Sequence, residues 1–153
     1  MLSRKAKYGL IASLDLARHF ERGPRLIADI ARDEELPRKF LELILLELKN
    51  AGFLDSKKGK GGGYQLAKSP HLITVGGIVR AIDGPLAPVR CASTMSPVPC
   101  EECLHPEWCG IRLVMKDTRD AISSVLDNTS LADVMSRSDA LREKTAKADM
   151  FYI

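Results

Sequence analysis

The chain has 153 residues, a formal net charge of +3 at pH 7 and 45% hydrophobic residues. This length fits one domain, or one domain with an appended dimerisation element, and the composition supports a packed core. No apolar run approaches the roughly 18 residues of a membrane span, and no signal-peptide pattern follows the basic start. We therefore expect a cytoplasmic protein without a membrane partner. In that compartment, clustered cysteines are more often metal ligands or redox sensors than structural disulfides.

Three helices are expected in the first third of the chain. Apolar residues recur at helical spacing over 5–19, and a short second helix follows over 25–32. Pro37 suits the first position of a third helix, which Asn and Gly close at 50–52. The apolar face of this third helix consists of Phe40, Leu41, Ile44, Leu45 and Leu48.

A β-hairpin with a tip rich in glycine and lysine is expected over 53–67. The glycines at 61–63 are either a flexible turn or a site of close backbone approach to a ligand. They are not a nucleotide phosphate loop, because the required ending and the strand-then-helix context are missing. Three helices followed by a basic hairpin predict a winged helix-turn-helix domain over residues 1–84, in a mainly α protein with a small β-hairpin wing.

In such a domain the third helix enters the major groove of double-stranded DNA by its N-terminal end, and the wing reaches the neighbouring groove. Arg and Lys donate to phosphates or guanine edges, and Glu accepts from the cytosine amino group. The alternative interpretations are a solvated surface with scattered lysines and, for Phe40, a place in the core. The candidate DNA-binding residues are Ser3, Lys5, Tyr8, Arg38, Lys39, Phe40, Glu42, Lys58, Lys60 and Gly61.

All the cysteines of the chain lie in a proline-broken loop over 85–109, with the spacing C-x8-C-x2-C-x5-C. Thiolates concentrated in one loop predict a soft-metal or cluster site. From the residues alone, three occupants stay open: an iron–sulfur cluster, a tetrahedral zinc ion, or no metal and a Cys100–Cys103 redox pair. The candidate ligands are Cys91, Cys100, Cys103 and Cys109.

Two further helices are expected around this loop. A short one over 73–83 has Thr74 as its N-cap, and the longest helix of the chain begins after Cys109. The apolar stripe of the long helix needs a partner, either a second copy of the chain or its own domain. We expect a homodimer that reads a pseudo-palindromic operator, with a dimerisation helix and a following short helix over 110–135. Residues 136–153 are a frayed helix or a tail.

Several separated motifs resemble one known family. They are KAKY at 5–8, LELIL at 41–45, NAGF at 50–53, KGKGGGYQL at 58–66, VGGIVRAIDG at 75–84 and LDNTSLAD at 126–133. Over about residues 1–135 the chain is similar to the Rrf2 family of bacterial winged-helix regulators. This resemblance implies a homodimer, a third helix in the major groove and a wing in the minor groove. It also implies cluster ligands in the loop before the long helix, which favours a [2Fe–2S] or [4Fe–4S] cluster.

The cysteine pattern departs from that of the cluster-binding branches, which space three cysteines C-x5-C-x5-C. Here Cys103 and Cys109 have that spacing, Cys91 comes first after an enlarged loop, and Cys100 is additional. Arg112 stands where the iron–sulfur biogenesis branch has a histidine ligand. Four cysteines can nevertheless hold a cluster by themselves.

The chain ends in the apolar residues Phe151, Tyr152 and Ile153. This ending resembles the cysteine-metabolism repressor branch, and a terminal isoleucine is also the residue by which serine acetyltransferase docks into cysteine synthase. The implied partner is cysteine synthase; the alternative is a tail that packs on the dimer or is disordered.

We expect a regulator and not an enzyme, because no catalytic set of residues stands out. The interpretation is a DNA-binding regulator controlled by its cysteine centre, in iron–sulfur, redox or sulfur metabolism. The alternative is a cysteine-metabolism repressor that acts through its tail, with its cysteines holding zinc or serving as a thiol switch.

Overall fold

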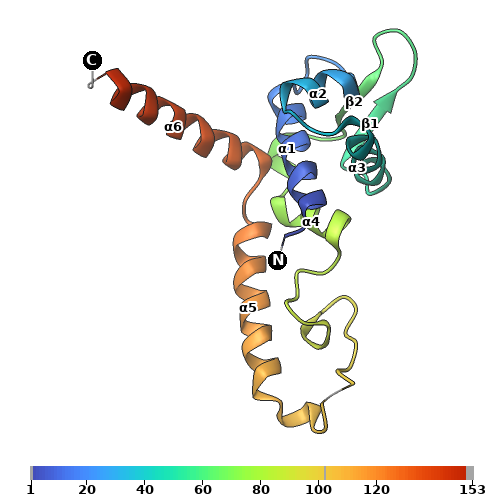
Figure 1. Cartoon of the computed structure of the whole chain (residues 1–153), viewed down its shortest axis with the longest axis vertical. Coiled ribbons are helices and arrows are strands. Elements are labelled where there is room, and N and C mark those ends of the chain that lie inside the picture. Colours follow the sequence, from blue (N-terminus) through green and yellow to red (C-terminus); the bar gives the residue numbers. More distant parts are fainter. Residues whose placement is uncertain (1, 102, 151–153) are drawn as a thin grey trace.

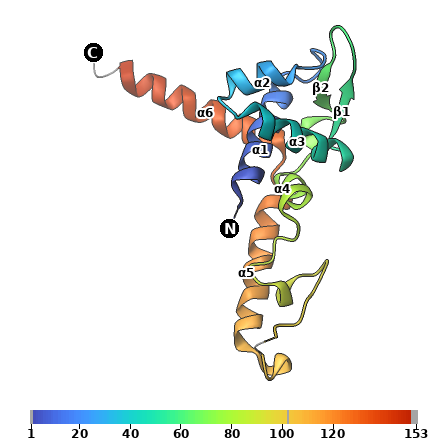
Figure 2. The same cartoon turned by 45° about the vertical axis from the view of Figure 1, so that its right-hand side comes forward.

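The computed structural model describes residues 2–101 and 103–150, with side chains as far as residue 146 (Figure 1). A winged domain occupies one end, α5 runs away from it, and α6 projects to the side (Figures 1 and 2). In chain order the elements are α1 (Arg4–Arg18), α2 (Ile27–Asp33), α3 (Arg38–Asn50), β1 (Leu54–Lys57), β2 (Gly63–Leu66), η1 (Pro70–Leu72), α4 (Val75–Asp83), η2 (Arg90–Ala92), η3 (Pro106–Trp108), α5 (Gly110–Asp127) and α6 (Leu131–Met150), where η marks short 3-10 helices.

One apolar core joins α1 to α4, the hairpin and the first turn of α6. The side chains at its centre are fully buried: Leu16, Ile30, Leu41, Ile44, Leu45, Leu48, Leu54, Ile73, Ile78 and Leu131. The predicted order of three helices and a hairpin, and the mainly α fold class, are therefore confirmed. Phe40, expected on the apolar face of α3, is 40% exposed and lies at the border of that face.

Hydroxyl side chains fix the first turns of two helices. The Ser3 hydroxyl accepts a hydrogen bond from the Ala6 amide at 3.0 Å, and the Thr74 hydroxyl accepts one from the Gly77 amide at 3.1 Å. Each bond satisfies an amide that has no partner inside its helix, and the predicted Thr74 cap is confirmed. Pro37 is the N-cap of α3 and not its first helical residue, because its ψ of 113° is extended.

The wing is an antiparallel hairpin that is also anchored to the segment before α2. Arg25 and Tyr64 exchange both backbone hydrogen bonds, each 2.8 Å long. Gly63 makes this approach possible, because its φ is +139° and a Cβ there would lie 2.1 Å from the Arg25 carbonyl oxygen. The hairpin is therefore held against the helical domain at its base.

Gly63→Ala is expected to lower the free energy of unfolding by about 2 kcal/mol or more, because the added methyl group collides with the Arg25 backbone. Urea unfolding followed by circular dichroism measures the loss. Gly59→Ala is the matched control: Gly59 also has a positive φ of +88°, but no atom lies within 4 Å of an added Cβ. It is expected to cost about 1 kcal/mol. Equal losses would show that backbone conformation alone requires glycine at Gly63.

The turn between α5 and α6 is tied to the start of α4. The Val75 amide donates to the Thr129 carbonyl, and the Leu131 amide donates to the Ile73 carbonyl, both at 2.9 Å. The Arg80 guanidinium binds the Asp127 carboxylate, with its Nη2 2.8 Å from Oδ2. The end of α5 is thereby fixed on α4, while the rest of α5 extends beyond the domain.

The Arg80 guanidinium lowers the pKa of Asp127 by hydrogen bonding, so this ion pair stabilises the fold when the carboxylate is ionised. Its contribution is present above the pKa of Asp127 in the unfolded chain and is lost as pH falls through the lower folded value. We expect Asp127→Asn to destabilise the protein by less than about 1 kcal/mol at pH 7, since the pair is partly exposed. The difference from wild type in urea midpoints should shrink below about pH 4. A difference that persists undiminished at pH 3 would contradict this assignment.

Helix α6 has 20 residues and reaches Met150, so the prediction of a short helix after α5 is wrong, as is the prediction that α5, with 18 residues, is the longest helix. Helix α6 includes most of the segment left open between a frayed helix and a tail. Arg18 of α1 holds its second turn, lying 3.4 Å from the Ser138 hydroxyl and 3.8 Å from the Asp139 carboxylate. The proposed docking residues, Phe151, Tyr152 and Ile153, lie outside the described residues.

Candidate nucleic-acid interface and cysteine site

The N-terminal turn of α3 is basic and open to solvent. Arg38 and Lys39 are exposed, and Arg38 Nε lies 3.4 Å from the Glu42 carboxylate. Exposed ion pairs of this kind contribute little to stability, so Arg38 and Glu42 can each exchange this contact for one with DNA. The geometry suits the predicted entry of α3 into the major groove.

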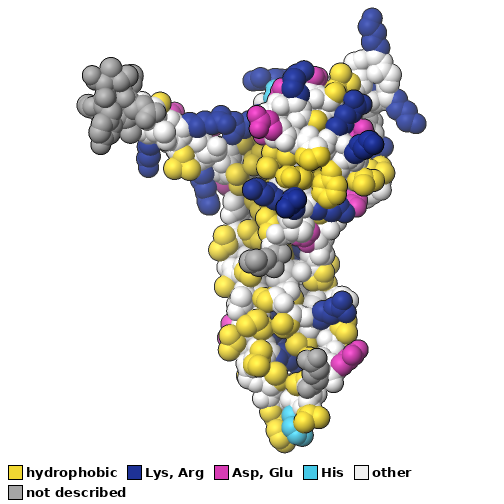
Figure 3. Space-filling view, viewed as in Figure 1, with side chains coloured by type: hydrophobic (Ala, Val, Ile, Leu, Met, Phe, Trp, Pro, Cys, Tyr) yellow, Lys and Arg dark blue, Asp and Glu magenta, His cyan; other side chains and the backbone are white. Residues whose placement is uncertain are grey.

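The wing extends this basic surface. Lys58, Lys60 and Gly61 are exposed at its tip, and β1 packs against α3. Lys and Arg side chains project outward from the hairpin in Figure 3. The three wing candidates therefore lie together, beside the helix that carries Arg38 and Lys39.

The candidates in α1 are engaged within the chain. The Ser3 amide donates to the Asp83 carboxylate at 2.9 Å, in addition to the capping role of its hydroxyl. Lys5 Nζ lies 2.5 Å from the Glu47 carboxylate. The Tyr8 ring meets the Phe40 ring edge-on, with centroids 6.0 Å apart. These contacts connect the start of α1 to α4 and α3, so they help to position α3. Direct DNA contacts from Ser3, Lys5 and Tyr8 stay predictions.

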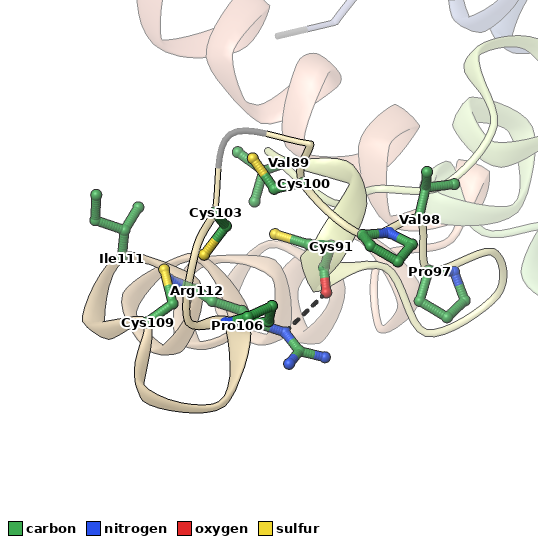
Figure 4. A pocket seen from close by; sticks show the side chains of 11 residues that line it. Val89, Cys91, Pro97, Val98, Cys100, Cys103, Pro106, Cys109, Ile111 and Arg112 are labelled. Carbon is green, nitrogen blue, oxygen red and sulfur yellow. Dashed lines mark hydrogen bonds between the residues drawn. The ribbon is translucent and has the colours of Figure 1, made fainter.

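The structure brings all four cysteines to one cavity of about 560 Å³ (Figure 4). Cys91, Cys103 and Cys109 are half-buried and Cys100 is exposed. The remaining lining is mostly apolar: Val89, Pro97, Val98, Pro99, Pro106, Ile111 and Arg112. Cysteines up to 18 positions apart in the sequence thus share one small space at the start of α5.

Cys109 is the N-cap of α5, and its sulfur accepts a hydrogen bond from the Arg112 amide at 3.4 Å. This bond is the main cause that lowers the pKa of the Cys109 thiol. Burial raises the pKa of Cys103, whose sulfur points toward that of Cys109 in Figure 4. Cys109 is therefore better prepared than Cys103 to act as a thiolate.

Two arginines of α5 hold the first cysteine in place, a role that the sequence did not reveal. Arg112 Nε donates to the Cys91 carbonyl at 3.1 Å, and Arg119 Nη1 donates to the carbonyl of Ala92 at 2.5 Å. The arginines are seven residues apart and so lie on one side of the helix. Their spacing on an amphipathic helix was the available signal. We call this pair the arginine clamp.

The four thiols fit a soft metal by their chemistry. Cysteine thiolates are the ligands of iron–sulfur clusters and of structural zinc. Among the described residues, no three Cys, His, Asp or Glu side chains lie close enough together to hold a metal ion. Binding would therefore require the loop to draw its sulfurs inward from the cavity walls.

Comparison with known proteins identifies the family. A sequence model for Rrf2, described as an iron-dependent transcriptional regulator, matches residues 2–137. The chain belongs to the Rrf2 family. The resemblance of its separated motifs is thereby confirmed, as is the winged-helix fold. Regulators of the Rrf2 family bind DNA and are dimeric.

Individual Rrf2 relatives match over nearly the whole chain. The regulator CymR of Bacillus subtilis is 36% identical over 152 residues, covering 99% of each chain. The regulator IscR of Yersinia enterocolitica is 32% identical over 140 residues, covering 92% of this chain and 82% of that one. The solved structure of B. subtilis CymR, described as the global cysteine regulator of that organism, has a TM-score of 0.73 at 34% identity, covering 90% of this chain and 97% of that one.

This Rrf2-family chain is a transcriptional regulator, and regulation rather than catalysis is the function named for its relatives. Within the parts of the chain that the structure describes, no helix is long and apolar enough to cross a membrane.

Proposed function

We propose that the protein is a homodimeric regulator whose operator affinity is set by a cysteine-ligated centre, with an iron–sulfur cluster as the leading occupant. The observation that carries this proposal is the shared cavity of all four cysteines at the start of α5. Cys91, Cys100, Cys103 and Cys109 would hold the group. A [2Fe–2S] or [4Fe–4S] cluster would supply a centre sensitive to iron supply or electron transfer. Zinc and a metal-free thiol switch are the alternatives.

A line of polar contacts supports a connection from this cavity to the winged domain. The arginine clamp ties the Cys91 end of the loop to α5. At the other end of α5, Asp127 is held by Arg80 of α4. A change in the loop can therefore tilt α5 about its Asp127 end, which is fixed on the winged domain.

The connection continues from α4 to the recognition helix. Asp83 at the end of α4 binds Ser3, which caps α1. Lys5 of α1 binds Glu47 of α3. In a dimer, a small rotation of each winged domain changes the spacing of the two recognition helices, and operator affinity depends on that spacing.

The test is an absorbance spectrum with iron, sulfide and zinc analysis of anaerobically purified protein, followed by gel shifts on the promoter of its own gene. We expect visible absorbance with iron and sulfide, and an operator affinity that changes when a chelator removes the metal. Cys109→Ala should abolish both the visible absorbance and the effect of the chelator on operator affinity. Zinc without iron would show that the site holds zinc and not a cluster. An operator affinity that does not change on metal removal would contradict a sensing role of the cysteine centre.

The similarity to B. subtilis CymR over 99% of the chain favours a second candidate function. We propose that the terminal residues Phe151, Tyr152 and Ile153 dock into cysteine synthase, with their carboxylate held by backbone donors. A pull-down with cysteine synthase would compare the full-length protein with a variant that lacks these three residues. Retention by the full-length chain alone supports docking, and equal retention contradicts it.

A further inference from the structure

The recognition helix turns leucines toward solvent. Leu43 is 59% exposed and Leu46 is 47% exposed, although α3 lies on the apolar core. At 100° per residue, Leu43, Leu46 and Lys39 all point away from the buried side of the helix. That buried side consists of Leu41, Ile44, Leu45 and Leu48.

These leucines do not complete the fold of their own domain. The outer side of an amphipathic surface helix is normally polar, because apolar groups there gain nothing from the core. Along α3, Lys39 lies one turn before Leu43, and Glu42 directly precedes Leu43. An apolar strip of this kind needs a partner that presents apolar groups at a fixed place.

The charge around the strip identifies DNA as that partner. Arg38 and Lys39 stand at the start of the same helix, and the wing beside it carries Lys58 and Lys60. Basic groups at the start of the helix and on the neighbouring wing complement the phosphates that border a groove.

We propose that Leu43 reads the 5-methyl group of thymine in the major groove and that Leu46 extends the same contact. Thymine is the only one of the four DNA bases that presents a methyl group there. The N-terminal half of a recognition helix supplies the base contacts, and Leu43 lies in the second turn of α3. Leu43 is thus a specificity-determining residue. The assignment rests on DNA binding by this chain, and its test separates the two.

The experiment begins by selecting duplexes from a randomised DNA library with the full-length protein. Each thymine of the selected duplex is then replaced by deoxyuridine, which lacks only the methyl group. We expect wild type to bind about fourfold more weakly at one or two positions in each half-site, the loss that corresponds to one buried methyl group. Leu43→Ala should bind the thymine duplex more weakly and should not distinguish thymine from deoxyuridine at the Leu43 position.

Two further variants make the outcome specific. Leu72→Ala truncates a leucine that is 69% exposed on η1, which packs beside α6, and should keep the full discrimination. Leu43→Gln should enrich adenine at the same position on reselection, because a glutamine amide pairs with the adenine edge. Equal binding of thymine and deoxyuridine by wild type, or discrimination kept by Leu43→Ala, would overturn the leucine assignment alone. Failure of wild type to enrich any sequence would overturn DNA binding as well.

Discussion

Val114→Asp is expected to convert the protein from a dimer to a monomer and to weaken operator binding by at least about a hundredfold. A carboxylate in the centre of an apolar interface loses its hydration without gaining a partner. Two linked recognition helices bind two half-sites far more tightly than one helix binds a single half-site. Light scattering measures the mass, and a gel-shift titration with the selected operator measures the affinity.

The expectation rests on the two sides of α5. Its apolar stripe recurs at intervals of three or four residues, and Ile111, Val114 and Val125 are 71%, 57% and 60% exposed. Hydrophobic side chains gather along this part of the molecule in Figure 3. The arginine clamp faces the loop from about a third of a turn away, and Asp127 faces α4 from nearly the opposite side of the helix. Val114 and Val125 are therefore left largely uncovered by the chain itself, and a second copy is the simplest cover for them.

Ser124→Asp adds the same charge to α5 at an exposed position about a quarter turn from Val114 and Val125. This control should remain a dimer and keep its operator affinity within about threefold. A dimeric Val114→Asp protein would show that the stripe packs against something other than the partner copy, as in the alternative of packing on its own domain.

The order of elements was predictable because its signals are local. Apolar periodicity defines α1, α3 and α5, and a hydroxyl before an apolar run marks the Thr74 cap. The gathering of the four cysteines at one place was also predictable, since cysteine is confined to one loop. Each of these inferences needs only neighbours within a few turns of the chain.

The contacts that could transmit a signal were not predictable, because they join distant residues. Asp83 binds Ser3 across 80 positions, and Arg119 binds the Ala92 carbonyl across 27. The ion pair of Lys5 with Glu47 was not predictable either, because the two residues are 42 positions apart. Leu43 was not among the candidates from the sequence, because a leucine in an apolar helix is assigned to the core unless its angular position is compared with that of its neighbours.

Replacing both clamp residues, with Arg112→Gln and Arg119→Gln, is expected to remove the effect of the cysteine centre on operator affinity. In wild type the loaded and chelator-treated proteins should differ in operator affinity by roughly the 5–150-fold range of allosteric couplings. In the double variant this ratio should approach one, because the Cys91 end of the loop is no longer held on α5. Gel-shift titrations of both forms measure the ratio, and iron analysis measures loading.

The matched control is Arg142→Gln with Lys144→Gln, which removes the same two charges from exposed positions on α6. It should lower operator affinity in both forms alike and leave their ratio unchanged. Loss of metal from the clamp variant would mean that the arginines position the ligands. An unchanged ratio with full loading would mean that the signal passes through the Cys109 end of the loop, which the covalent chain joins to α5 directly. The clamp is the stronger candidate, because a shift at one end of a loop moves a helix only if the other end is also held.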